Sequence, residues 1–444
     1  MKAGFAKLEI TSPLGSNLNG YFTVRPAQDI IEPLYANALA FSDGENTALA
    51  ISLDISEIIQ KDTDDIRSRV SAATGVPFEA VFVACIHTQT APVISEIGGF
   101  FKRDPNYYDF FCKKICDCAV LAIRDMTDAI PSIARTKAEG ISFVRRFITK
   151  DGVTVTNPSS KIIENIAGPI GKPDETVQLV KFERPGASDI AVVNFQTHPD
   201  VLGGNKICPD WPCYVRNTLE NALSDVADGK GVKVIFFNGA QGDVAHNDRL
   251  HGIIRRGPEH SRHMGRAIAG AVMGVYTYTE PVSDDKVFFK QNMTKAALCK
   301  GTDEQVAIAK EIDKKFLAGE DISDCKFSIT LTRKYLRNEN EPPIVDLNIV
   351  CIGFGDVVFV GLPGEPFTTI GVQIKENSPF KMTIPCCNAN GSAGYFPTDD
   401  ALTSSGYESA SSPFLPGIAN NVIETSLRTL NELNEELKKI RIIC

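Results

Sequence analysis

Five apolar runs in the sequence are typical of buried β-strands, and each leads to a residue that can bind a metal or transfer a proton. Strands buried on both faces have near-continuous Val, Ile and Phe sequences. The runs cover residues 81–86, 190–195, 232–237, 357–361 and 380–384, and they lead to His87, His198, Asp243, Glu365 and Tyr395. Proteins with parallel or mixed sheets build their sites just beyond strand ends. We therefore expect these side chains to gather along one sheet edge as a metal site.

Segments with helical patterns lie between these runs over the first 280 residues. We expect helices at about residues 62–73, 107–126, 211–226 and 259–276. Strands and helices that alternate in this way are typical of α/β proteins. The sequence therefore predicts an α/β (α+β) fold, with mixed β-sheets flanked by helices and the active site at strand ends.

Residues 282–346 have a different character, and we interpret them as an accessory segment. We expect a charged helix at 302–319, a strand at 327–332 and a loop at 338–343. Strands then resume at Val345, and an amphipathic helix over about residues 417–440 follows near the end. Because no segment has the composition of a flexible linker, we expect residues 1–444 to form one domain.

Composition restricts the kinds of partner and the compartment. The formal net charge of −9 argues against a nucleic acid or an anionic membrane as the main partner. No run approaches the roughly 18 apolar residues that an integral membrane segment needs, and the N-terminus has no apolar signal core, so we expect a cytoplasmic protein. The twelve Cys residues form no CxxC pair, which favours buried, reduced thiols over a zinc cluster.

The two candidate histidines are each open to a second interpretation. His87 stands in Cys-Ile-His-Thr-Gln-Thr-Ala-Pro, and His198 stands in Gln-Thr-His-Pro-Asp. Either could be a structural side chain that is hydrogen-bonded within a loop. Neutral imidazole is the commonest metal-ligand side chain, so two histidines at strand ends together favour a metal site.

The candidate carboxylates and tyrosines also have alternatives. Glu365 follows Leu-Pro-Gly, and its alternative role is to stabilise a helix N-terminus through the helix dipole. Asp243 follows a glycine-rich turn, which is no phosphate loop because no Gly-Lys-Ser/Thr follows. Tyr395 and Tyr407 lie in loop-like segments, where a tyrosine is usually a packing residue.

Taken together and in order, these segments resemble the neutral/alkaline (non-lysosomal) ceramidases over most of the chain, from Gly4 to about Pro416. The resemblance rests on His87-Thr-Gln-Thr-Ala-Pro92, His198, Pro363-Gly-Glu-Pro-Phe-Thr368, Tyr395-Phe-Pro-Thr398 and Tyr407-Glu-Ser-Ala-Ser411. That family consists of zinc amidases with two His, a Glu and a Tyr as ligands. The resemblance implies a Zn²⁺ cofactor held by His87, His198, Glu365 and Tyr395.

The resemblance also implies residues that act on the substrate. Arg145 matches an arginine of the family, Tyr407 lies in a matching segment, and Gln89 stands where the family has a second histidine. We expect these three to be catalytic residues, as donors to a developing oxyanion. A serine with a catalytic role in the family is Ala245 here, and we expect no C-terminal immunoglobulin-like domain.

The activity implied is zinc-dependent hydrolysis of an amide bond, by metal-activated water, in a small N-acyl or amide substrate that need not be the sphingolipid ceramide. One alternative is a metal-dependent hydrolase of another small amide or ester. Another is an inactive homologue that only binds its ligand, which Ala245 and Gln89 favour. Mixed imidazole, carboxylate and phenol ligands also accept iron or manganese. The sequence leaves the oligomeric state open.

Overall fold

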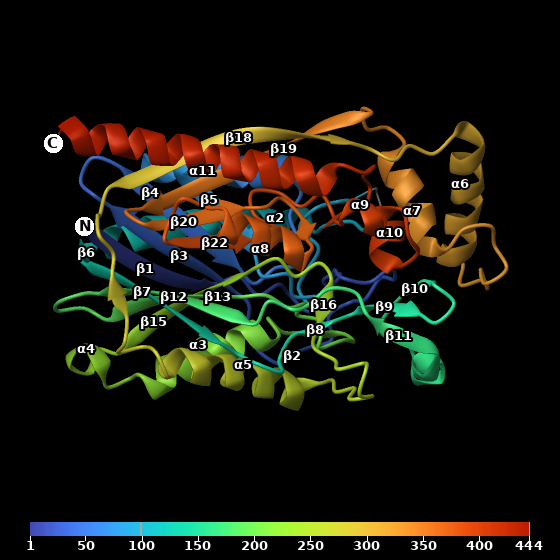
Figure 1. Ribbon diagram of the computed structural model, residues 1–444, viewed down its shortest axis with the longest axis horizontal. Coiled ribbons are helices and arrows are strands. Elements are labelled where there is room, and N and C mark those ends of the chain that lie inside the picture. The colour runs from blue at the N-terminus through green and yellow to red at the C-terminus, as the bar shows by residue number, and fades with distance from the viewer. Residues whose placement is uncertain (98–99, 444) are drawn as a thin grey trace.

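Three β-sheets form the centre of the structure, a computed structural model that describes residues 1–97 and 100–443 (Figure 1). The first has the order β5-β4-β3-β1-β6 (Val81–Cys85, Thr47–Leu53, Tyr35–Ser42, Lys2–Glu9, Thr127–Asp128). The second has the order β15-β13-β12-β7-β17 (Val232–Asn238, Asp189–Phe195, Thr176–Glu183, Ile130–Lys137, Glu280–Pro281). The third has the order β18-β19-β20-β22 (Val287–Ala297, Ile344–Phe354, Val357–Gly361, Met382–Cys386).

Shorter strands form separate small sheets. A small sheet has the order β10-β9-β11 (Thr154–Thr156, Arg146–Thr149, Ile166–Pro169). Three two-stranded pairs are β14 with β2 (Lys206–Ile207, Asp29–Ile30), β16 with β8 (Val244–Ala245, Phe143–Val144) and β21 with β23 (Glu365–Pro366, Tyr395–Phe396). The last of these pairs carries two of the candidate metal ligands.

Helices cover the outer faces of the three sheets (Figure 1). The first sheet packs against α1 (Gln60–Thr74) and α2 (Pro105–Arg124), and the second against α3 (Trp211–Ala222) and α5 (Pro258–Met273). The third packs against α8 (Thr368–Glu376) and α11 (Ile418–Ile443). The other α-helices of the described residues are α4 (Val226–Gly229), α6 (Asp303–Leu317), α7 (Ile329–Asn338), α9 (Asp399–Leu402) and α10 (Tyr407–Ser411). The predicted fold class, mixed sheets flanked by helices, is confirmed.

Each main sheet contains one parallel strand pair, and the candidate metal ligands follow strands of these pairs in the chain. The pairs are β4 with β5, β13 with β15, and β20 with β22. Strands β5, β13, β20 and β22 are buried along their whole length. The expectation of a single sheet edge is therefore wrong, because the strand ends come from three sheets. Apolar runs identify buried strands, but they do not indicate which strands pair with one another.

The parallel pairs of the three sheets pack together around a core of phenylalanines. The ring of Phe82 in β5 lies 6.2 Å from that of Phe237 in β15 and 6.3 Å from that of Phe359 in β20. The rings of Phe237 and Phe359 are 5.5 Å apart. Edge-to-face contacts at such distances add to the free energy gained by burial. This shared core brings the carboxyl ends of all three strands to one place.

The accessory segment differs in part from its prediction. The strand expected at 327–332 is wrong, because α7 covers Ile329–Asn338. Ser328 caps this helix by accepting a hydrogen bond from the backbone N–H of Leu331 at 3.3 Å, and its β-branched residues do not prevent the helix. Helices α6 and α7 pack together at the end of the molecule opposite both termini (Figure 1). The single domain over 1–444 stays a prediction.

No helix within residues 1–97 and 100–443 has the length and apolar character needed to cross a membrane.

Candidate metal centre

His87 follows directly after β5 and presents one ring nitrogen to the centre of the site. Its Nδ1 lies 3.0 Å from the backbone carbonyl of Ser56 and 3.0 Å from the amide nitrogen of Asn388. Its Nε2 lies 3.1 Å from the Glu365 carboxylate. The backbone of His87 has a φ of 73°, which non-glycine residues adopt infrequently and which is often found at functional sites.

His198 follows β13 and is oriented in the same way. Its Nδ1 lies 2.8 Å and 3.0 Å from the carbonyls of Gln241 and Val244. Its Nε2 lies 3.1 Å from the Glu365 carboxylate and 3.2 Å from the Tyr395 hydroxyl. A backbone carbonyl on the second ring nitrogen fixes the tautomer and the ring orientation that a metal-binding histidine requires.

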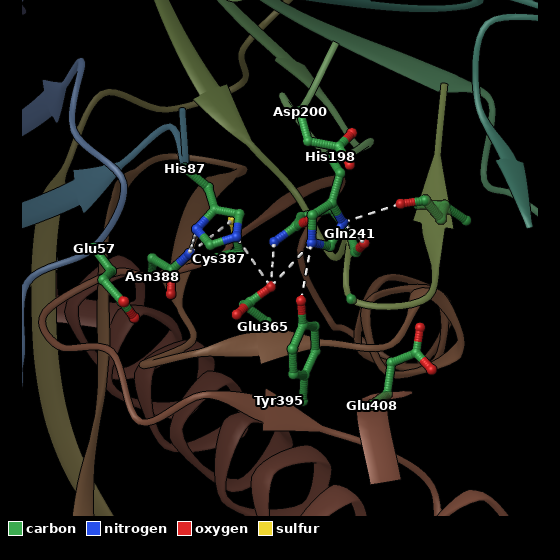
Figure 2. Close-up of polar contacts among 12 residues, drawn as sticks. Glu57, His87, His198, Asp200, Gln241, Glu365, Cys387, Asn388, Tyr395 and Glu408 are labelled. Carbon is green, nitrogen blue, oxygen red and sulfur yellow. Dashed lines mark hydrogen bonds and ion pairs between the residues drawn. The ribbon is translucent and has the colours of Figure 1, made fainter. Parts of the chain in front are cut away.

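Glu365 and Tyr395 reach the same point from the parallel pair β21 and β23. Figure 2 shows the Glu365 carboxylate between the two imidazole rings and the Tyr395 hydroxyl beside it. Gln241 donates a hydrogen bond of 3.3 Å to the same carboxylate oxygen. Ligand atoms of His87, His198 and Glu365 all lie within 4.8 Å of one another.

The electrostatics of the cluster follow from burial and proximity. Burial alone would raise the pKa of Glu365, but the two histidines outweigh it and hold the pKa well below its usual value. Burial would lower the pKa of His87, but Glu365 raises it to about 9. For His198, burial and Arg145 lower the pKa. Burial and Glu365 raise the pKa of the Tyr395 phenol, against the opposing charge of Arg145.

Two imidazoles, a carboxylate and a phenol with convergent donor atoms fit a divalent metal ion such as zinc. Both rings direct Nε2 toward the centre of the cluster, and a cation would oppose the rise in the pKa of Tyr395. The structure thus brings together all four residues that the sequence singled out as ligands, and their binding of a metal stays a prediction.

Asp243 does not join this cluster, contrary to the expectation. Its carboxylate accepts hydrogen bonds from the backbone N–H and the hydroxyl of Thr368, at 2.7 and 2.8 Å. Thr368 is the first residue of α8, directly after the strand that carries Glu365. Asp243 therefore stabilises the segment that positions Glu365. The glycine-rich sequence before Asp243 did not indicate this role.

Gly242→Ala is expected to disturb the site through the backbone. A Cβ at residue 242 would lie 2.5 Å from the carbonyl oxygen of Glu365 and 2.9 Å from that of Pro366. Overpacking of this kind costs about 1–3 kcal/mol of unfolding free energy and displaces the backbone. We expect a lower denaturation midpoint together with weaker metal binding. Gly270→Ala, where a Cβ meets nothing within 4 Å, is the control. Unchanged stability and metal affinity in Gly242→Ala would contradict this account.

The three residues expected to act on the substrate line a cavity of about 490 Å³ beside the cluster. Arg145 donates hydrogen bonds of 2.7 Å to Glu408 and to the carbonyl of Gly242. Its guanidinium carbon lies 5.4 Å from the Tyr395 ring centre, and the rings of Tyr395 and Tyr407 are 5.8 Å apart. Gln89 lines the same cavity, so the structure places all three beside the candidate metal ligands.

Other lining residues were missed by reasoning from the sequence. Asp200 lines the cavity and is bonded to His246 at 2.9 Å, and its place two residues after His198 was the available signal. Glu57 lines it from the segment after β4. The basic residues of α7 also line it, and they were missed because the strand predicted at 327–332 hid the start of this helix. Ala245 is buried in β16, with 3% of its surface exposed.

Comparisons with known proteins show what the chain is similar to. No protein-family model matches the sequence, and no curated protein matches it either. Among solved structures, neutral ceramidase from Pseudomonas aeruginosa superposes with a TM-score of 0.76 and 16% identity, over 98% of this chain and 74% of that chain. A ceramidase complexed with C2 superposes with a TM-score of 0.74 and 16% identity, over 98% and 75% of the two chains. The chain therefore has a ceramidase-like fold.

Proposed function

We propose that this protein is a zinc-dependent amide hydrolase of the neutral ceramidase type, acting on an N-acyl substrate. The observation that carries the proposal is the arrangement of His87 and His198, whose Nε2 atoms face Glu365 while backbone carbonyls contact both Nδ1 atoms. Tyr395 completes a set of four donors beside a cavity. The likeness in fold to two ceramidases supports the same class of reaction.

When bound by these four residues, a zinc ion would supply a Lewis acid that polarises an amide carbonyl and makes water more acidic. The chain itself supplies fixed charge and hydrogen-bond donors. Arg145 is held rigidly by Glu408 and by the Gly242 carbonyl, so its charge needs little reorganisation to stabilise a developing oxyanion. Tyr407 and Gln89 offer a hydroxyl and an amide donor to the same cavity.

The apolar part of the cavity fits the acyl group of such a substrate. Phe22, Ile97, Phe100 and Phe101 line it. Ligand cavities are mostly apolar, with a few polar groups that fix orientation. Burial of an acyl chain against these rings would contribute about 0.8 kcal/mol per CH₂ group. The aromatic wall therefore favours an N-acyl substrate over a small polar amide.

A protein that binds the ligand without turnover is the second candidate. It is favoured by Ala245 and Gln89, which offer neither the hydroxyl nor the imidazole that the ceramidase resemblance expects at these positions. In the zinc mechanism a serine nucleophile is not required, so Ala245 does not exclude hydrolysis.

A hydrolysis panel on the metal-loaded full chain tests the proposal. The substrates are ceramides, N-acyl amino acids and simple esters, and the readout is release of the acyl product. We expect cleavage of at least one N-acyl amide, at a rate that depends on the metal. Ester cleavage alone would select a different hydrolase. No cleavage of any substrate by protein that retains its metal would contradict the hydrolase proposal and favour the binding protein.

A further inference from the structure

One face of α7 presents three basic side chains to the cavity. Arg333, Lys334 and Arg337 all line it. Residues three and four positions apart lie on the same side of a helix, so these three form a single basic face. The face stands at one wall of the cavity, with Phe22, Phe100 and Phe101 nearby.

Arg337 lies next to the candidate metal ligands. Its Nη1 would be 3.2 Å from a Cβ built on Gly394, the residue before Tyr395. The carbonyl of Gly394 accepts a hydrogen bond from the backbone N–H of Glu365 at 2.9 Å. Among the residues that the structure describes, Arg337 has no hydrogen bond and no ion pair. Burial lowers its pKa, against the more distant charges of Glu57, Glu341 and Glu365.

The other two cations of this face are incompletely satisfied. Lys334 donates to the carbonyl of Ser409 at 2.9 Å and forms no ion pair within the described part of the chain. Arg333 is bonded to Asp313 at 3.2 Å through Nε, but its buried Nη2 has no partner. A buried charged group without its partner costs free energy, because water no longer solvates it.

The acidic residues of the cavity each accept hydrogen bonds or form an ion pair. Glu57 accepts hydrogen bonds from Asn19 at 3.3 Å and from Ser392 at 2.9 Å. Asp200 is paired with His246, and Glu365 belongs to the candidate metal centre. The charged side chains that α7 presents to the cavity are all positive, and Arg337 is the one without a hydrogen bond among the described residues.

We propose that Arg337 and Lys334 bind an anionic group of the substrate, and that the substrate is an N-acyl amino acid. Because Arg337 lies beside Gly394, the residue before the candidate ligand Tyr395, an anion bound there fits a substrate whose charge is close to the scissile amide. A carboxylate on the carbon attached to the amide nitrogen meets this condition. This inference rests on the proposed hydrolase function. Water adds across the C–N bond, with hydroxyl to the acyl carbon and a proton to nitrogen, which releases a carboxylic acid and a free amino acid.

The test is direct binding of two uncleavable ligands to the metal-loaded full chain by calorimetry. Both are ketomethylene analogues of an N-acylglycine, in which CH₂ replaces the amide NH. One ends in a carboxylate and the other in a carboxamide. We expect the carboxylate to bind roughly 10- to 100-fold more tightly, the range for a hydrogen bond to a charged group. Arg337→Gln should remove most of this preference, and Arg337→Lys should retain part of it.

Lys334→Gln is the second variant, and it should also weaken the preference. Lys314→Gln is the control, because Lys314 is an exposed cation of α6 that does not line the cavity. Equal binding of the two ligands, binding of neither, or a preference that survives in both Arg337→Gln and Lys334→Gln would overturn the inference. Since neither ligand is cleaved, a preference for the carboxylate would stand even if the hydrolysis panel failed.

Discussion

His198→Ala is expected to lose bound metal and hydrolytic activity together. The Nε2 of His198 lies within hydrogen-bonding distance of both Glu365 and Tyr395. Alanine therefore removes the candidate metal-ligand atom that contacts two of the other candidate ligands. A metal supplies several kcal/mol of transition-state stabilisation, which corresponds to a loss of roughly 100- to 10,000-fold in kcat/KM. The measurements are metal content by elemental analysis and the rate on the substrate cleaved best in the panel.

His251→Ala is the matched control for this variant. The His251 side chain is 70% exposed and bonded to Asp248, away from the candidate metal centre. It should keep its metal and its rate. If His198→Ala is folded and retains full metal occupancy, the assignment of the ligands is wrong.

Arg216→Met is expected to lower the free energy of unfolding by about 3–5 kcal/mol, the cost of breaking a buried ion pair. Arg216 in α3 forms two hydrogen bonds with Asp54, at 2.8 and 2.7 Å, and both side chains are at most 1% exposed. Asp54 follows β4 of the first sheet, whereas α3 packs on the second. Within the described part of the chain, the variant leaves the buried Asp54 carboxylate with one side-chain hydrogen bond, which it accepts from the backbone N–H of Tyr35.

Urea denaturation compares this variant with Arg69→Met. Arg69 pairs with Asp65 at 3.0 Å, but both side chains are more than 40% exposed, and exposed pairs contribute only about 0–1 kcal/mol. The double variant Asp54→Leu, Arg216→Met should recover much of the loss, because no unpaired charge remains. Equal effects of Arg216→Met and Arg69→Met would show that the buried pair does not hold the two sheets together.

The strands and the candidate ligands could be predicted because their signals are local. Uninterrupted apolar runs indicate strands that are buried on both faces. The bounds of the observed strands agree with those of the runs to within about two residues, for β5, β13, β15, β20 and β22. The first helix ends at Thr74, with Gly75 in the left-handed conformation, as a C-terminal glycine indicates. His87 and His198 lie shortly after such strands, and Glu365 and Tyr395 begin the short strands β21 and β23 that follow β20 and β22. Because each side chain alone had a second interpretation, the set of four ligands came from the resemblance to the ceramidases.

Other features depend on pairing and packing, which the sequence pattern does not encode. The ligands come from three sheets because Phe82, Phe237 and Phe359 meet between them, and no single run contains that information. The basic face of α7 was missed because apolar and β-branched residues near its start favoured a strand. Asp243 resembled a ligand in the sequence, yet its geometry makes it an acceptor for Thr368.

Elemental analysis of the purified, untagged full chain is the most direct test of the metal centre. The convergence of His87, His198, Glu365 and Tyr395 predicts about one zinc ion per chain, retained after excess metal is removed. That result should disappear in His198→Ala and persist in His251→Ala. If no metal is bound, even after zinc is added and the excess removed, the proposed metal centre is wrong, and so is the zinc-dependent hydrolase mechanism that depends on it.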